Sequence, residues 1–514
     1  MREFISARDN DEGRGVARRR LTAGLVSSPW RRILLRKKRV IVPGAIALAL
    51  YLGNRGVSFS EAVVALGALI LAVVVFSGEW GIQFGFALWV LTLALGYRTV
   101  RLTSNLPIHP AEILIWVLFL SICLHRRLVS TATLSLPLWM WLMLPFWLLG
   151  WWPLISGSAY WDQMLNEFRN FVLLIPLMIV ATVVLRRRHT WRLLLWAFFA
   201  AGTWIAILGI LEFYVVGVAR LVPAFMTSTN AGTIEGFERA MFSFWGGPMA
   251  TFICALALPI GIVAVRWWQT AWQRAAIIAS TIAQIVAVYI GGYRSIWLLV
   301  VIEILLACFL SLKRQRVAVA AVCVLVTVAG YQFVPQSGSQ RALSGIEALR
   351  GHATDSSAKD RINRARSAFE QMVAAPLGSG WSASGWVHSD FVQVGANLGL
   401  LGGMIFLGGY LFTLWRLFRR VLVDARNEDE GDLGVTLLLS YISAGGILAT
   451  QGVEVLPQLV LPVWFVWVLV EVWLTQRSDA PVLGEAAHIV FQSESLTPDS
   501  WWPAPLSSRE GVKQ

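Results

Sequence analysis

Residues 275–312 read AAIIASTIAQIVAVYIGGYRSIWLLVVIEILLACFLSL, an apolar run interrupted by a single Arg and a single Glu. As one helix it would be about 57 Å long at 1.5 Å per residue, whereas the hydrocarbon core of a bilayer is about 30 Å thick. The run therefore predicts two membrane-spanning helices. Paired glycines end a helix readily and a charge seeks the interface, so we expect the break at residues 291–294, Gly-Gly-Tyr-Arg.

The rest of the chain is similarly apolar. Of its 514 residues, 57% are hydrophobic and 14% are charged, whereas soluble domains have roughly 45–50% apolar and about 25% charged residues. Polar residues are too few to cover a soluble fold, and the apolar fraction is too high for a disordered chain. Much of the net charge of +13 lies in short clusters between apolar runs, which indicates membrane topology rather than nucleic-acid binding. We therefore expect an integral membrane protein.

Hydropathy predicts an all-α, polytopic fold with about 12–14 transmembrane helices. The candidate spans are Val40–Gly53, Glu61–Ser77, Trp80–Tyr97, Ala111–Leu124, Leu134–Gly150, Phe171–Leu185, Trp191–Gly217, Met241–Val265, Ala275–Ile290, Ser295–Leu312, Val317–Val334, Phe391–Trp415, Leu433–Thr450 and Pro457–Thr475.

Basic clusters between the spans predict the orientation of the chain. With a cytoplasmic N-terminus, the loops richest in Arg and Lys fall on the inside, as the positive-inside rule requires; they are residues 125–127, 186–189, 266–274, 313–316 and 416–426. Residues 1–39 then form a basic cytoplasmic tail, residues 40–475 the transmembrane domain, and residues 476–514 a mostly disordered cytoplasmic tail. Three outer loops of substance are expected, at residues 151–170, 218–240 and 335–387, and the last is the longest.

This outer loop contains the pattern of an amphipathic helix. Ser357 and Asp360 are spaced as a capping box, and Pro376 ends the segment. Apolar residues recur at helical spacing between them, at Ile362, Ala365, Phe369 and Val373. We expect this helix to lie on the membrane face or over the mouth of a cavity.

Three candidate site residues fall at the predicted outer interface. Arg239 begins a span, Arg294 lies at the tip of the glycine hairpin, and His388 ends the long loop. A single interfacial arginine more often reaches lipid phosphates, and a single histidine is more often merely solvated. Because all three residues fall on one side, we interpret them as parts of one site.

Several motifs share the order found in one family. They are Asp360–Arg361, APLGSGW at 375–381, VHSDF at 387–391, NLGLLG at 397–402, ERAMFSFWGGP at 238–248 and YRSIWL at 293–298. Over about residues 190–475, the chain resembles the O-antigen ligase and polymerase family of bacterial membrane proteins. Two residues depart from that pattern: Ser389 stands where asparagine is more usual, and Tyr293 where a small residue is.

The resemblance implies a GT-C-like glycosyltransferase of the bacterial inner membrane, with cytoplasmic termini, a periplasmic loop at 335–387 and a periplasmic active site. Its donor would be a glycan on undecaprenyl diphosphate. The acceptor hydroxyl would belong to a lipid A core sugar for a lipopolysaccharide ligase, or to a lipid-linked repeat for a polymerase of surface polysaccharide or exopolysaccharide. Membrane lipids would be its other partners. Arg239 and Arg294 would bind the diphosphate, and His388 would contact or deprotonate the acceptor.

The residues fit this chemistry without a metal or another cofactor. A departing diphosphate is strongly anionic, and arginines stabilise it through bidentate hydrogen bonds. The predicted outer loops contain no Asp-x-Asp pair of the kind that holds a divalent ion in soluble glycosyltransferases. Arg361 is a candidate third cation, although a solvated face of the loop helix explains it equally well. Histidine titrates in the range needed to accept a proton from an alcohol.

Two other function classes remain open. A transporter or flippase predicts charges near the middle of the membrane and two similar halves. The spans hold mainly Glu212, Glu303 and Glu471, and no internal repeat is visible. A peptidoglycan-type polymerase predicts a carboxylate base in an outer loop, for which Asp355 or Asp360 could serve.

The orientation can be tested directly. Cysteines introduced beside Arg239, Arg294 and His388 should react with an impermeant thiol reagent added from outside, because the basic loops place all three residues there. Labelling of any one of them only from the cytoplasmic side would exclude a shared site.

Overall fold

The computed structural model describes residues 78–95, 100–101, 107–125, 136–155, 161–186, 188–215, 240, 242, 248–264, 270–310, 356–385, 387–423, 428–451 and 457–478. The predicted N-terminal tail, the C-terminal tail beyond residue 478 and three of the predicted spans (Val40–Gly53, Glu61–Ser77 and Val317–Val334) lie outside these residues.

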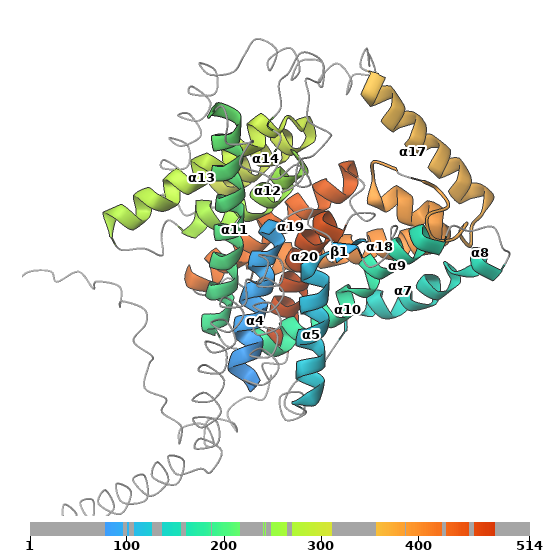
Figure 1. Ribbon diagram of the computed structural model, residues 1–514, viewed down its shortest axis with the longest axis horizontal. Coiled ribbons are helices and arrows are strands. Elements are labelled where there is room, and N and C mark those ends of the chain that lie inside the picture. Colours follow the sequence, from blue (N-terminus) through green and yellow to red (C-terminus); the bar gives the residue numbers. More distant parts are fainter. Residues whose placement is uncertain are drawn as a thin grey trace, which may run out of the picture.

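The described part of the chain is helical apart from one pair of short antiparallel strands, β1 (Val100–Arg101) and β2 (Pro107–Ile108) (Figure 1). The helices are α4 (Gly78–Thr92), η1 (Leu93–Leu95), α5 (Pro110–Leu124), α7 (Leu138–Leu149), α8 (Trp152–Ile155), α9 (Trp161–Val172), α10 (Leu174–Val184), α11 (Arg188–Tyr214), η4 (Pro248–Ala250), α12 (Thr251–Ala264), α13 (Ala271–Gly291), α14 (Arg294–Leu310), α17 (Ser356–Ala374), α18 (Asp390–Val423), α19 (Glu428–Thr450) and α20 (Pro457–Ser478).

Six helical segments among these residues are long and apolar enough to cross a membrane. They are Met164–Val184, Thr190–Tyr214, Ala271–Gly291, Asp390–Leu422, Gly431–Thr450 and Leu459–Gln476. Three shorter apolar helices accompany them: Pro110–Leu124, Leu138–Leu149 and Thr251–Val263. The chain is thus a polytopic, helical membrane protein, as its composition predicts.

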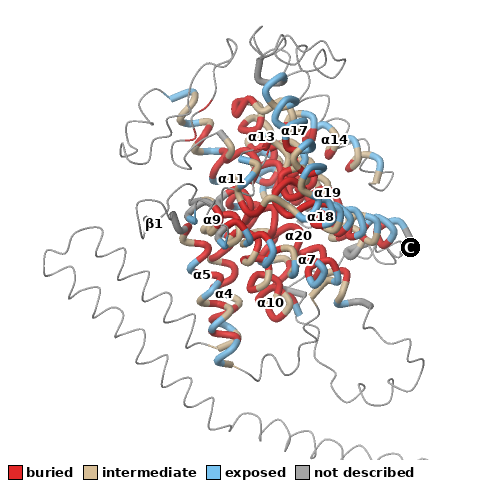
Figure 2. The backbone as a smooth tube through the Cα atoms, turned by 90° about the vertical axis from the view of Figure 1, so that its right-hand side faces the viewer, coloured by how far each residue is buried: buried red, intermediate tan, exposed pale blue. Residues whose placement is uncertain are grey.

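Helix α20 lies at the centre of the bundle (Figure 2). Every residue from Leu459 to Val472 is buried, and the helix contacts α9, α10, α12, α18 and α19. A helix that is apolar on all sides needs protein on all sides, or lipid. Two aromatic side chains of α20, Trp464 and Trp467, pack against Phe406 of α18 with ring centroids 6.1 and 5.5 Å away.

The predicted break in the long apolar run is confirmed. Helix α13 ends at Gly291, and α14 begins at Arg294. Gly291 packs so closely on Thr251 of α12 that a Cβ atom there would collide with the threonine side chain. The two glycines therefore allow both a helix end and a close approach of α12 to the hairpin.

The boundary predicted for the span at Phe171 is wrong. The structure continues this helical segment upstream through α9 to Trp161, into a stretch expected to be an outer loop. Glu167 and Arg169 lower the hydropathy of that stretch, yet Glu167 is buried and Arg169 forms an ion pair with Glu112 of α5. Hydropathy underestimates such a helix because it counts polar residues as exposed.

The amphipathic loop helix is confirmed as α17, which starts one residue before Ser357. One of its faces, with Ala368 and Met372, packs against the start of α18. Another face leaves Ile362, Phe369 and Val373 between 55% and 62% exposed. An exposed apolar stripe of this kind is typical of a helix that lies at a membrane surface.

We predict that this stripe contacts lipid. A nitroxide on Phe369→Cys, in a protein whose four native cysteines are replaced, should be more accessible to oxygen than to a polar nickel complex in liposomes. Asn363→Cys, on an exposed polar side of α17, should show the opposite preference. Equal accessibility at the two positions would place α17 away from the bilayer.

Candidate functional site

Three of the four site residues predicted from the sequence lie in the described part of the chain, in two separate regions. His388 lies two residues before the start of α18, and Arg361 lies in the second turn of α17. Arg294 is the first residue of α14. Arg239 lies outside the described residues.

The structure brings His388 and Arg361 together. Burial first, and then the positive charges of Arg361 and Arg364, lower the pKa of His388 to about 4, while Asp360 opposes them. The imidazole is therefore neutral at pH 7 and able to accept a proton. Arg364, which forms an ion pair with Asp360 at 2.8 Å, was not among the candidates from the sequence.

Arg294 belongs to the hairpin between α13 and α14. The adjacent Ser295 hydroxyl accepts a hydrogen bond from Gln451 Nε2 at 2.5 Å, which joins this hairpin to the end of α19. The Ala240 backbone N–H donates to the carbonyl of Ile290 at 3.0 Å. Ala240 thus lies against the hairpin that carries Arg294.

Helix α18 is not the single straight span predicted from Phe391 to Trp415. Gly399 has φ 85° and ψ 168°, which breaks the helix into two parts. A straight helix would separate residues 391 and 406 by about 22 Å, yet the rings of Phe391 and Phe406 are 5.6 Å apart. The ring of Phe391 is also 5.5 Å from that of Tyr410. The part before Gly399 therefore folds back alongside the part after it.

Two glycines permit this reversal. Gly378, in the turn after α17, has φ 96°, and Gly399 has φ 85°; both values favour glycine. A Cβ atom on Gly378 would lie 2.5 Å from the carbonyl oxygen of Asn397, and one on Gly399 would lie 2.6 Å from the amide nitrogen of Gly378. The Leu400 N–H donates to the Pro376 carbonyl at 3.1 Å, which closes the contact.

The loop between α17 and α18 is fastened to the end of α7. The Trp381 backbone N–H donates to the carbonyl of Gly150, and its indole Nε1 donates to the carbonyl of Trp147, both at 3.0 Å. The indole is buried against Phe168 and Phe171 of α9. The loop segment before His388 is thereby held on the helix bundle.

Glu167 of α9 is the polar centre of this region. Its side chain is buried, and its Oε2 accepts hydrogen bonds from the Ser382 backbone N–H at 2.7 Å and from Asn397 Nδ2 at 2.9 Å. Its Oε1 accepts a bond from Gln393 Nε2 at 3.3 Å. Gln393 Oε1 in turn accepts a bond from the Val387 N–H at 3.1 Å.

Sequence reasoning missed these residues. Glu167 was assigned to an outer loop, and Asn397 was noted only within a glycine motif. The available signal was the spacing of Gln393 and Asn397, two amides four residues apart in an otherwise apolar helix. Buried polar side chains at that spacing need polar partners on a neighbouring helix.

A second buried polar cluster lies on the other side of α9. Arg169 Nε is 3.0 Å from Glu112 Oε2, and Glu112 Oε1 accepts a bond from the His109 backbone N–H at 2.9 Å. His109 caps α5 by accepting a bond from the Ala111 N–H at its Nδ1. His109 is buried, so this cap lies inside the helix bundle.

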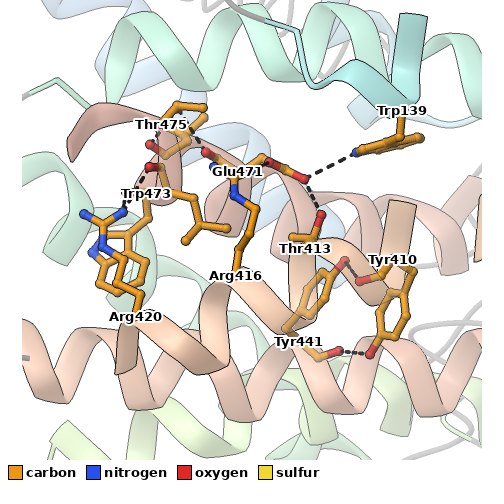
Figure 3. Close-up of polar contacts among 11 residues, drawn as sticks. Trp139, Tyr410, Thr413, Arg416, Arg420, Tyr441, Glu471, Trp473 and Thr475 are labelled. Atoms are coloured by element: carbon orange, nitrogen blue, oxygen red, sulfur yellow. Dashed lines mark hydrogen bonds and ion pairs between the residues drawn. The ribbon is translucent and has the colours of Figure 1, made fainter. Parts of the chain in front are cut away.

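Figure 3 shows a third cluster, which joins the far part of α18 to α20 and α7. Glu471 of α20 accepts hydrogen bonds from the Thr413 hydroxyl and from Trp139 Nε1, the latter at 3.3 Å, and pairs with Arg416 at 3.4 Å. Arg420 donates to the carbonyls of Trp473 and Leu474. This cluster lies beyond Tyr410, along the helix from the bend.

Among the described residues, no group of three or more His, Cys, Asp or Glu side chains is arranged to hold a metal ion. The polar groups around His388 are the guanidinium groups of Arg361 and Arg364, the carboxylate of Asp360 and, behind the loop, the carboxamides that bind Glu167. Guanidinium groups can bind an anion, and a neutral imidazole can accept a proton.

No family model matches the chain, and no curated protein matches it at a significant level. The family resemblance that the motifs indicate therefore stays a prediction.

Proposed function

We propose that the chain is a membrane glycosyltransferase of the O-antigen ligase and polymerase type. It would transfer a glycan from undecaprenyl diphosphate to an acceptor hydroxyl on the outer face of the membrane. The observation that carries this proposal is the neutral, half-buried imidazole of His388 beside Arg361 and Arg364. A base for an alcohol and cations for a phosphate are the two things that the reaction needs.

The proposed step is a displacement at the anomeric carbon. The acceptor oxygen forms a bond to this carbon while His388 takes the hydroxyl proton. The bond between the anomeric carbon and the phosphate oxygen breaks, and the diphosphate leaves with the electron pair. Arginine side chains stabilise the charge that develops on the leaving oxygen. Arg361 and Arg364 are the candidates from α17, and Arg239 and Arg294 are those that the sequence motifs indicate.

A transporter or flippase is the second candidate. Glu303 of α14 is fully buried, with the Ser443 hydroxyl donating to one carboxyl oxygen and no hydrogen bond to the other. Ionisable groups buried in membrane helices often belong to ion or substrate pathways. We favour the transferase because the His388 cluster combines a base with cations, whereas Glu303 is a single group.

We predict that His388→Gln inserts and binds the lipid-linked donor but transfers glycan at least about a hundredfold more slowly, since general-base catalysis contributes roughly 10²–10⁴-fold. The measurement is single-turnover transfer by purified protein. His125→Gln, at the C-terminal cap of α5, is the matched control and should keep the wild-type rate. Near-normal transfer by His388→Gln would remove His388 from the mechanism.

We also predict that transfer continues in the presence of a strong chelator, because arginines carry the phosphate charge. Rates with and without EDTA should agree within about twofold under the conditions of the His388 assay. Loss of activity that Mg²⁺ or Mn²⁺ restores would contradict this prediction and point to carboxylate ligands.

A further inference from the structure

Glu167 connects three segments that are separate in the sequence. It lies on α9, whereas its partners are the loop residue Ser382 and two residues of α18, Gln393 and Asn397. Glu167 is only 2% exposed. Water therefore competes little for these hydrogen bonds, and each donor depends on the carboxyl group for its partner.

Gln393 extends this connection to the residue beside His388. Its amide nitrogen donates to Glu167 Oε1, and its amide oxygen accepts a bond from the Val387 N–H. Val387 is buried and packs with Ala368 of α17 and Ala396 of α18. The backbone just before His388 is thus tied to α9 by two hydrogen bonds in series.

Glu167 also holds the earlier part of the loop, through Asn397 and Ser382. Asn397 donates to Glu167 Oε2, and its oxygen accepts bonds from the backbone N–H and the hydroxyl of Ser384 at 3.1 and 2.8 Å. Ser382 donates directly to the same carboxyl oxygen. The loop is therefore bound to Glu167 both at Ser382–Ser384 and at Val387.

The position of this loop determines the surroundings of His388. Three charged residues of α17 act on the imidazole: Asp360, Arg361 and Arg364. Asp390 follows His388 at the start of α18, and Glu167 of α9 lies on the far side of Gln393 from it. A loop that detached from α9 would let the imidazole move away from the arginines and into water.

We propose that Glu167 is a positioning residue that holds the loop from Ser382 to His388 against α9 and so keeps the His388 imidazole beside Arg361 and Arg364. The inference deepens the proposed function, because the imidazole is the base of that reaction. It does not depend on the glycan or on the acceptor.

The bonding pattern suggests a selective disruption. Ser382 and Asn397 both donate to Oε2, and Gln393 donates to Oε1. In Glu167→Gln, the new amide oxygen can still serve Ser382 and Asn397, while the new NH₂ group faces the NH₂ group of Gln393. Two donors then oppose each other, and the connection to Val387 and His388 is lost.

The reciprocal exchange should repair it. In the double variant Glu167→Gln with Gln393→Glu, the NH₂ group at position 167 donates to the new carboxyl group at position 393. The second oxygen of that carboxyl group accepts the Val387 N–H. Rescue by this exchange distinguishes a specific hydrogen bond from a general need for a polar side chain.

The readout is the reaction of His388 with diethylpyrocarbonate, followed by peptide mapping of purified protein between about pH 4.5 and 7.5. The reagent attacks neutral imidazole. Wild-type His388 is half-buried and has a pKa of about 4, so its rate at neutral pH should be slow. In Glu167→Gln the rate at neutral pH should rise about tenfold and fall below about pH 6, as the pKa returns toward its ordinary value of about 6.5.

Glu370→Gln is the control, because Glu370 is exposed on α17 and pairs with Arg366. It should react like the wild type, and the reciprocal double variant should return to the wild-type profile. A Glu167→Gln profile that matches the wild type would overturn the proposal, as would a double variant that remains as reactive as the single one.

A second variant tests the proposal if Glu167→Gln does not fold. Gln393→Ala removes the connection to Val387 but leaves the bonds of Glu167 to Ser382 and Asn397, and it should also raise the reactivity of His388. Wild-type reactivity in folded Gln393→Ala would overturn the proposal.

A transfer assay separates this proposal from the proposed function. If the wild type transfers glycan, the acidic limb of its pH–rate profile should shift upward in Glu167→Gln, with kcat reduced more than KM is raised. If the wild type transfers none, the proposed function fails, while the diethylpyrocarbonate result still decides whether Glu167 positions His388.

Discussion

The contact between Gly378 and Gly399 determines how the region around His388 is built. Each glycine has a positive φ, and neither leaves room for a Cβ atom. The contact joins the turn after α17 to the bend in α18, so α17 and the first part of α18 pack together. The loop between these two segments packs on α7 and α9, where Trp381 donates to carbonyls at the end of α7 and Ser382 donates to Glu167.

The sequence predicted those features that depend on hydrophobicity and helix ends. The break at Gly291 and the extent of α17 follow from local patterns, and the structure contains both. Its failures have a common cause. The helix through Glu167 and the bend at Gly399 depend on contacts with residues elsewhere in the chain. A hydropathy scale scores each residue by itself and does not include such contacts.

The sequence identified some residues of the candidate site but not the contacts that position them. His388 and Arg361 were identified from their position in a loop and from motif order, and the structure places them in one electrostatic cluster. Their mutual position depends on Gln393 and Asn397, whose side chains are polar residues inside an apolar helix. Such residues indicate a buried partner, but the sequence does not say which helix supplies it. Arg239 and the loop around it lie outside the described residues, so their part in the site stays a prediction.

The cluster of Glu471, Arg416 and Arg420 has a mechanical consequence. Because α18 is joined to α20 through an ion pair and two carbonyl bonds, rotation of its far part about the helix axis would break all of these contacts. That part of α18 therefore acts as a fixed post. A displacement of the first part of α18 relative to this fixed part would therefore have to be accommodated by the backbone at Gly399, where the helix is already broken.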